Sequence, residues 1–240
     1  MLFAFRVTVL LIYFLLIACV GLLIGLVRPF NPDNSRIIAK MYAWGGQRIL
    51  GVRVTAEGVD NFGQDPCIIV ANHQDNLDLF ILGGILPRRT VSVGKKSLIW
   101  IPFFGLMYWL AGNVLIDRGN PRKARDTMSS AVDALRERNT SIWIFPEGTR
   151  NRGENMLPFK KGAFHTAVRA GVPIVPVCVN SYVKGTDFGR RHSGDAQVRV
   201  LPAIETKGLT LDDVPRLMQQ CYLQMMAGIE DLDRKLLPAA

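Results

Sequence analysis

The chain has 240 residues, 49% of them hydrophobic and 20% charged, and this composition excludes a disordered or collagen-like polymer. The length suits one large α/β domain with a hydrophobic core of its own. The 29 Lys and Arg residues outnumber the 20 Asp and Glu residues, which indicates an anionic partner such as nucleic acid, an acidic membrane surface or a phosphorylated substrate.

An apolar segment lies near the start of the chain. Residues 7–27 contain no charged side chain, and as a helix they would extend about 30 Å, enough to cross the hydrocarbon core of a bilayer. A cleaved signal peptide is an alternative, and residues 16–19, LIAC, also resemble a lipoprotein acylation site. Because the apolar run continues to Arg28 without a polar tether, we expect a retained membrane helix. Its length does not decide whether it crosses the bilayer or lies within one leaflet.

A second helix is expected directly after this segment. Residues 28–34 hold two prolines that end the apolar helix, and Ser35 is a suitable N-cap for a helix running to about Leu50. Residues 1–50 are therefore predicted to form a membrane-anchoring helical hairpin. The basic residues that follow the apolar run favour the cytoplasmic face of a membrane.

Residues 51–240 are predicted to form one α/β domain. Helical segments alternate with short apolar runs, several of them apolar at consecutive positions as in buried parallel strands. An amphipathic crossover helix is expected at residues 120–138 and a C-terminal helix at residues 210–236. The predicted fold is a mixed, largely parallel sheet flanked by helices, with strands at residues 52–58, 66–71, 90–94, 113–117, 141–145, 172–179 and 197–201.

The cysteines do not indicate a disulfide framework or a metal site. They are widely spaced, with no CxxC pair and no Cys and His cluster at zinc spacing. The sequence also lacks a GxSxG elbow, and no cysteine lies in a recognisable nucleophile context. A covalent acyl-enzyme and a bound cofactor are therefore not expected.

The first candidate site is the segment ANHQDNLDLF at residues 71–80. On one continuous helix His73 and Asp78 would lie about 140° apart and could not meet. They can meet if a strand ends near Ala71, the chain turns, and a helix capped by Asp75 or Asn76 begins near Leu77. A carboxylate on one ring nitrogen would leave the other free to act as a general base. The alternative is a polar turn with a solvated histidine.

The second candidate site is the segment IFPEGTRNRG at residues 144–153. A strand that ends before Glu147, Gly148, Thr149 and Arg150 offers backbone donors, a small residue for close approach and a guanidinium suited to phosphate. A surface turn with incidental charge is the alternative. Arg118 likewise follows a predicted strand, and ligands of open α/β sheets bind at the carboxyl ends of strands.

Together these segments resemble the glycerolipid acyltransferase family. Its motifs occur in order as NHQDNLD, NVLIDR, FPEGTR at residues 145–150 and VPIVPV at residues 172–177. The intervening segments VGKKSLIWIPFFG and LPFKKGAFH are also similar to bacterial members. Four motifs in order, after an apolar anchor, make the resemblance specific.

The resemblance implies transfer of a fatty acyl group to the sn-2 hydroxyl of lysophosphatidate. The donor would be a thioester of acyl carrier protein or coenzyme A, both acting as substrates. His73 would be the base and Asp78 would orient it. The resemblance assigns the glycerol phosphate to motif positions Arg118, Glu147, Gly148, Thr149 and Arg150. Lys95 and Lys96 are further candidates for phosphate or oxyanion contact, or else a solvated basic turn.

The sequence departs from the family pattern at one position, and the resemblance leaves the choice of acceptor open. Asp75 stands where the family more often has Ser or Asn, and we expect it to cap the following helix, facing away from His73. Another lysophospholipid, glycerol 3-phosphate or an aminolipid could be the acceptor, or the chain could be a non-catalytic module that binds anionic lipid. Membrane phospholipids are expected partners and nucleic acid is not. The resemblance to bacterial members implies a bacterial inner membrane with the catalytic domain on its cytoplasmic side.

Overall fold

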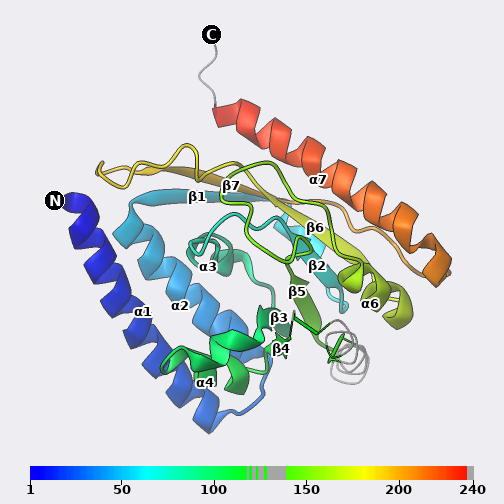
Figure 1. Ribbon diagram of the computed structural model, residues 1–240, viewed down its shortest axis with the longest axis horizontal. Coiled ribbons are helices and arrows are strands. Elements are labelled where there is room, and N and C mark those ends of the chain that lie inside the picture. Colours follow the sequence, from blue (N-terminus) through cyan, green and yellow to red (C-terminus); the bar gives the residue numbers. More distant parts are fainter. Residues whose placement is uncertain (118, 121–122, 124–126, 129–138, 237–240) are drawn as a thin grey trace.

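A computed structural model describes residues 1–117, 119–120, 123, 127–128 and 139–236 (Figure 1). Its centre is a seven-stranded sheet with the order β1-β7-β6-β2-β5-β3-β4, in which every neighbouring pair is parallel except β6 and β7. The strands are β1 (Val52–Glu57), β2 (Ile68–Ala71), β3 (Thr90–Lys95), β4 (Val114–Ile116), β5 (Ser141–Ile144), β6 (Ile174–Val179) and β7 (Gly194–Val200). The mixed, largely parallel sheet is confirmed, with each expected strand within a few residues of its predicted place.

Helices lie before, between and after the strands. They are α1 (Leu2–Val27), α2 (Asp33–Leu50), α3 (Asp78–Leu82), α4 (Phe104–Leu110), α6 (Gly162–Ala170) and α7 (Val214–Leu236), and short 3₁₀ helices include η3 (Lys96–Trp100) and η4 (Leu211–Asp213). The predicted C-terminal helix is present as η4 and α7. The crossover helix expected at residues 120–138 falls largely outside the described residues.

The two faces of the sheet are covered by different helices (Figure 1). Side chains alternate along β2, so Ile69 and Ala71 pack with α2, α3 and α4, whereas Ile68 and Val70 pack with α6 and α7. All four side chains are fully buried. A central strand enclosed on both faces explains why this stretch of sequence has no polar residue.

The helical hairpin is present, but its second helix starts differently from the prediction. Helix α2 begins at Asp33 with Pro32 as N-cap, and the Asn31 side chain accepts the Asp33 N–H at 3.0 Å. Ser35 is not the cap. It is buried within the first turn, where its hydroxyl donates to the Asn113 side chain at 2.9 Å and lies 3.2 Å from the Ala111 carbonyl. Because this hydroxyl bonds to residues just before β4, it does not cap α2.

Helix α1 packs against the rest of the protein along one side. Ile17 and Ala18 join the same hydrophobic cluster as β2 and α3, and most other α1 side chains face outward. Among the described residues, α1 is the one helix long and apolar enough to cross a membrane. Because the hairpin and the sheet share a cluster, a domain boundary at residue 50 stays a prediction.

Arg6 fastens the N-terminal end of α1 to the connection between β6 and β7. It is only 7% exposed, and its guanidinium donates to the carbonyls of Phe188, Arg190 and Arg191 and to the Ser193 hydroxyl, at 2.5–3.0 Å. A buried guanidinium is tolerated because these oxygens accept its N–H groups. The apolar helix is thus attached to the α/β domain near its first turns as well as through α2.

Replacing Arg6 with Met should loosen this attachment. We expect the free energy of unfolding to fall by about 1–3 kcal/mol, because the buried Ser193 hydroxyl and three partly buried carbonyls lose their donor. Thermal unfolding in detergent micelles measures the change. The matched control is Arg53→Met, since the Arg53 side chain is 72% exposed and lies 3.7 Å from Asp195. Equal melting temperatures for the two variants would contradict the anchoring role.

Candidate active site

His73 and Asp78 meet in the turn that follows β2. The strand ends at Ala71, α3 begins at Asp78, and His73 Nδ1 lies 2.6 Å from Asp78 Oδ2. The expected juxtaposition is therefore present. The expected cap is wrong, because Leu77 occupies the N-cap position of α3. Asp75 instead accepts the Leu77 N–H at 3.1 Å, and its carboxylate makes no hydrogen bond to His73.

Both carboxylate oxygens of Asp78 are held by donors. Oδ2 also accepts the backbone N–H groups of Gln74 at 2.8 Å and Asp75 at 3.2 Å, and Oδ1 accepts the Tyr182 hydroxyl at 2.6 Å. Asp78 is only 2% exposed, so its negative charge depends on these bonds for stabilisation. Burial first, and then the charge of Asp78, raises the pKa of the Tyr182 hydroxyl far above its usual value. The hydroxyl therefore stays protonated and acts as a donor.

The dyad leaves one ring nitrogen available for proton transfer. With its Nδ1 hydrogen on Asp78, His73 can accept a proton at Nε2, which has no hydrogen-bond partner among the described residues. The ring stacks on Phe145 with centroids 4.0 Å apart and an angle of 16° between planes. Its side chain is 15% exposed. The imidazole is thus oriented by a carboxylate and an aromatic ring while one nitrogen can still reach a substrate.

The buried side chain of Glu147 connects the two candidate segments. Its Oε1 accepts the His73 N–H at 2.7 Å, and its Oε2 accepts the Leu157 N–H at 2.8 Å and lies 3.3 Å from Asn151 Nδ2. The residue is 2% exposed. Burial raises the pKa of its carboxyl, and the three hydrogen bonds oppose that rise. Direct contact of Glu147 with the acceptor stays a prediction, while its visible contacts brace the site.

Backbone hydrogen bonds extend the same connection. The Asn151 N–H donates to the His73 carbonyl at 2.8 Å, and the Arg152 N–H donates to the Gln74 carbonyl at 2.9 Å. On the other side, the Asn72 amide both donates to and accepts from the backbone of Val179, at 2.9 and 2.8 Å. The turn that carries the dyad is therefore fastened to the loop after β5 and to the end of β6.

The remaining residues of the second segment lie toward solvent. Thr149 and Arg150 are exposed, and Gly148 adopts a left-handed conformation with φ of 71° that favours glycine. Lys160 crosses this turn: a Cβ added at Gly148 would lie 2.7 Å from its Nζ. Lys160, which no motif singles out, thus adds a positive charge beside the candidate phosphate site.

Two further predicted cations, Lys95 and Lys96, lie at the same edge of the sheet. β2, β5 and β3 are adjacent and parallel, so their carboxyl ends meet at one edge. Lys95 ends β3 and Lys96 begins η3, and both are exposed. Arg118 lies outside the described residues, and the strand before it, β4, is the parallel neighbour of β3. Lys95 and Lys96 therefore place positive charge at the edge of the sheet that also carries the dyad.

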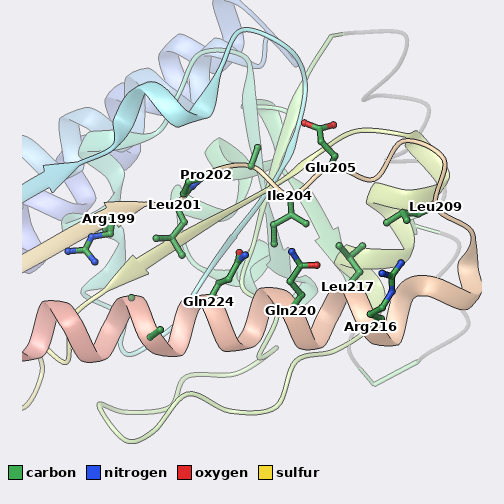
Figure 2. A pocket seen from close by; sticks show the side chains of 13 residues that line it. Arg199, Leu201, Pro202, Ile204, Glu205, Leu209, Arg216, Leu217, Gln220 and Gln224 are labelled. Atoms are coloured by element: carbon green, nitrogen blue, oxygen red, sulfur yellow. The ribbon is translucent and has the colours of Figure 1, made fainter.

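A separate groove of about 650 Å³ lies elsewhere in the molecule (Figure 2). Its lining comes from the end of β7, the segment after it and α7, with side chains such as Ile204 and Gln220 facing each other. None of its lining residues belongs to the loops after β2, β3 or β5. The groove is therefore distinct from the site around His73.

The buried cysteines are poorly suited to act as nucleophiles. Burial raises the pKa of Cys67 to about 11 and the pKa values of Cys178 and Cys221 to about 12. A thiol must ionise to attack a thioester efficiently. Direct activation of a substrate hydroxyl by the imidazole fits these residues better.

A His and Asp pair at the carboxyl edge of an α/β sheet is an arrangement suited to general-base catalysis on a hydroxyl. The profile of the Acyltransferase family matches residues 53–180. The chain belongs to the Acyltransferase family.

Several relatives cover nearly the whole chain. The 1-acyl-sn-glycerol-3-phosphate acyltransferases of Salmonella typhimurium and Escherichia coli are each 41% identical over 98% of this chain and 96% of their own. The alpha enzyme of Homo sapiens is 39% identical over 92% of this chain and 78% of its own. The crystal structure of the 1-acyl-sn-glycerophosphate acyltransferase from Thermotoga maritima matches 99% of this chain and 100% of its own, with a TM-score of 0.74 and 23% identity. That match shows the fold.

Tyr182, whose hydroxyl donates to Asp78 at 2.6 Å, is a residue that the sequence analysis did not single out. Replacing it with Phe should lower kcat about tenfold while leaving both KM values nearly unchanged, because a charged hydrogen bond to Asp78 is lost and the ring packing is kept. Steady-state kinetics on purified protein measures this. The matched control is Tyr222→Phe, which removes a 2.9 Å bond to the Met156 carbonyl away from the dyad. A similar loss of kcat in both variants would contradict the positioning role.

Glu147→Gln should destabilise the protein and reduce activity together. The amide nitrogen cannot accept from a backbone N–H, so one buried donor is left unpaired at a cost of about 1–3 kcal/mol. Thermal unfolding and kcat measured on the same preparation check this. Glu154→Gln is the control in the same loop, because the Glu154 side chain is 78% exposed. If Glu147→Gln melts like native protein, the bracing role is wrong.

Proposed function

We propose that the protein transfers a fatty acyl group to the sn-2 hydroxyl of lysophosphatidate to form phosphatidate. The names of the relatives that are 41% identical support this acceptor. The observation that carries the chemistry is the 2.6 Å contact between His73 and Asp78, which leaves Nε2 open. The acyl donor is a thioester of acyl carrier protein or coenzyme A, and the basic chain complements both of these acidic donors.

The reaction follows from the geometry of the dyad. His73 Nε2 takes the proton of the acceptor hydroxyl as its oxygen attacks the thioester carbonyl. The imidazolium that forms is stabilised by Asp78 at Nδ1. When the tetrahedral intermediate collapses, the carbon–sulfur bond breaks and the imidazolium returns the proton to the departing thiolate. The histidine ends each turnover neutral, and no covalent enzyme intermediate is needed.

The acceptor phosphate is proposed to bind the cationic edge beside the dyad. Arg150 offers a fork of donors that matches phosphate oxygens, and Lys95, Lys96 and Lys160 add positive charge. Arg118 is proposed from its motif position. Gly148 lets the chain approach the phosphate closely, and Thr149 adds a hydroxyl in the same turn.

The membrane helix is proposed to hold this edge at the surface where the lysolipid resides. Arg6 ties the start of α1 to residues 188–193, and α2 ties its end to the sheet. A helix fastened at both ends to the same domain suits insertion into one leaflet better than crossing. We place the protein on the cytoplasmic side of a bacterial inner membrane, where acyl thioesters are available.

His73→Ala tests the proposed chemistry. We expect acyl transfer to fall by about 10²–10⁴-fold, because the base is removed. The assay supplies purified protein with lysophosphatidate and with each thioester donor in turn, and product is measured by mass. Lys207→Ala is a control because its side chain belongs to neither candidate segment. Transfer near the native rate in His73→Ala would disprove the base assignment.

A panel of acceptors tests the substrate. Native protein should acylate lysophosphatidate faster than lysophosphatidylethanolamine, lysophosphatidylglycerol or glycerol 3-phosphate, because the proposed site recognises a terminal phosphate on an acylated glycerol. Faster acylation of another acceptor would keep the general-base mechanism and overturn the substrate. Lipid binding without any transfer would instead indicate a non-catalytic membrane module.

A further inference from the structure

A second apolar segment lies far from α1 in sequence. Residues 97–116 contain no charged side chain, yet they form no long helix. They fold as η3, the seven-residue α4 and β4, so this segment cannot cross a bilayer. Its apolar character is also not explained by burial, because many of its side chains face outward.

The outward side chains are large and mostly aromatic. Trp100 is 83% exposed, Phe103 is 53% exposed and Trp109 is 45% exposed, and Ile101 and Leu106 are exposed beside them. Phe103 adopts φ of 60°, which is unusual for a bulky residue. A soluble protein rarely exposes so many large apolar side chains within ten residues, and such groups mark an interaction surface. These five residues are called the α4 surface below.

Helix α4, which carries the α4 surface, lies beside α1 (Figure 1). Helices α1 and α4 pack closely, since a Cβ added at Gly21 would lie 2.8 Å from Met107 and one at Gly25 would lie 2.8 Å from Leu110. After α1, Phe30 packs edge-on against Trp109 with ring centroids 4.9 Å apart. The exposed side chains next to this contact on α1 include Leu23, Leu26 and Val27. One apolar surface therefore extends from the end of α1 onto α4.

We propose that the α4 surface is a second membrane-contacting element, inserted into the same leaflet as α1. The inference rests on the membrane attachment stated under the proposed function. Indole and phenyl rings favour the boundary between headgroups and acyl chains. Lys95 and Lys96, directly before η3, can reach anionic headgroups at that depth. A lipid leaflet suits a surface that adjoins α1, the helix long and apolar enough to cross a membrane.

Insertion of the α4 surface would orient the sheet edge that carries the dyad toward the membrane. Because η3 follows directly from β3, whose carboxyl end lies at the edge that carries the dyad, insertion of the α4 surface holds this edge against the lipid. The acceptor hydroxyl can then reach His73 with its acyl chain still in the leaflet. Attachment through α1 alone would leave the domain free to tilt about one helix.

The four tryptophans of the chain allow a direct test. Trp143 is 3% exposed in the core and serves as an internal reference that should not be altered. The first variant carries Trp44→Phe and Trp109→Phe, so that Trp100 and Trp143 remain. The second carries Trp44→Phe, Trp100→Phe and Trp109→Phe, so that only Trp143 remains. Both are full-length proteins reconstituted on vesicles of phosphatidylethanolamine and phosphatidylglycerol.

The measurement is fluorescence quenching by bromine on the lipid acyl chains near the headgroup. We expect brominated vesicles to quench the first variant clearly more than the second, and unlabelled vesicles to protect Trp100 from aqueous iodide. Equal bromine quenching in both variants, with iodide still reaching Trp100, would overturn the proposal. A matching variant that retains Trp109 and Trp143 repeats the test at the other end of the α4 surface.

Acyl transfer measured on the same vesicles separates this inference from the proposed function. Lipid quenching of Trp100 without product formation on any acceptor would refute the enzymatic proposal and support the α4 surface. Product formation without lipid quenching of Trp100 would support the enzymatic proposal and refute membrane contact by the α4 surface. Melting temperatures of both variants show that the folded chain was measured.

Discussion

The buried carboxylate of Asp78 is the constraint on which the site depends. A negative charge that is only 2% exposed must be matched by donors, and here they come from an imidazole, two backbone N–H groups and the Tyr182 hydroxyl. These donors lie in the turn after β2 and in the connection after β6. One charge therefore joins two segments about a hundred residues apart, and the orientation of the His73 imidazole follows from it.

Glu147, in the neighbouring loop, is likewise a buried carboxylate held by hydrogen-bond donors. The motif residues therefore form two groups, one buried and one exposed. Asp78 and Glu147 are buried and satisfied by the protein itself, so they shape the site. Thr149, Arg150, Lys95 and Lys96 are exposed and remain able to meet a ligand. A preformed inner framework with an adaptable cationic rim suits the capture of a flexible phospholipid, since the reacting hydroxyl needs a fixed base and the headgroup does not.

The sequence predicted features set by local periodicity or short spacing. All seven strands, the C-terminal helix and the meeting of His73 with Asp78 followed from apolar runs and from a five-residue turn. Features that depend on distant partners were not predictable: Tyr182 reaches Asp78 over 104 positions, and Ser35 turns to Asn113 instead of capping α2. Asp75 shows the same limit over a short distance. Its side chain is of a type that caps helices, but it accepts the Leu77 N–H within the turn instead.

The connection between β6 and β7 contacts both the dyad and helix α1. It presents Tyr182 to the dyad, and further along its carbonyls receive the guanidinium of Arg6 from the first turns of α1. Deleting the apolar helix to obtain a protein that is easier to handle would therefore strip donors from the very segment that steadies the acid of the dyad. Truncation for solubility and retention of full catalytic competence are, in this chain, opposing aims.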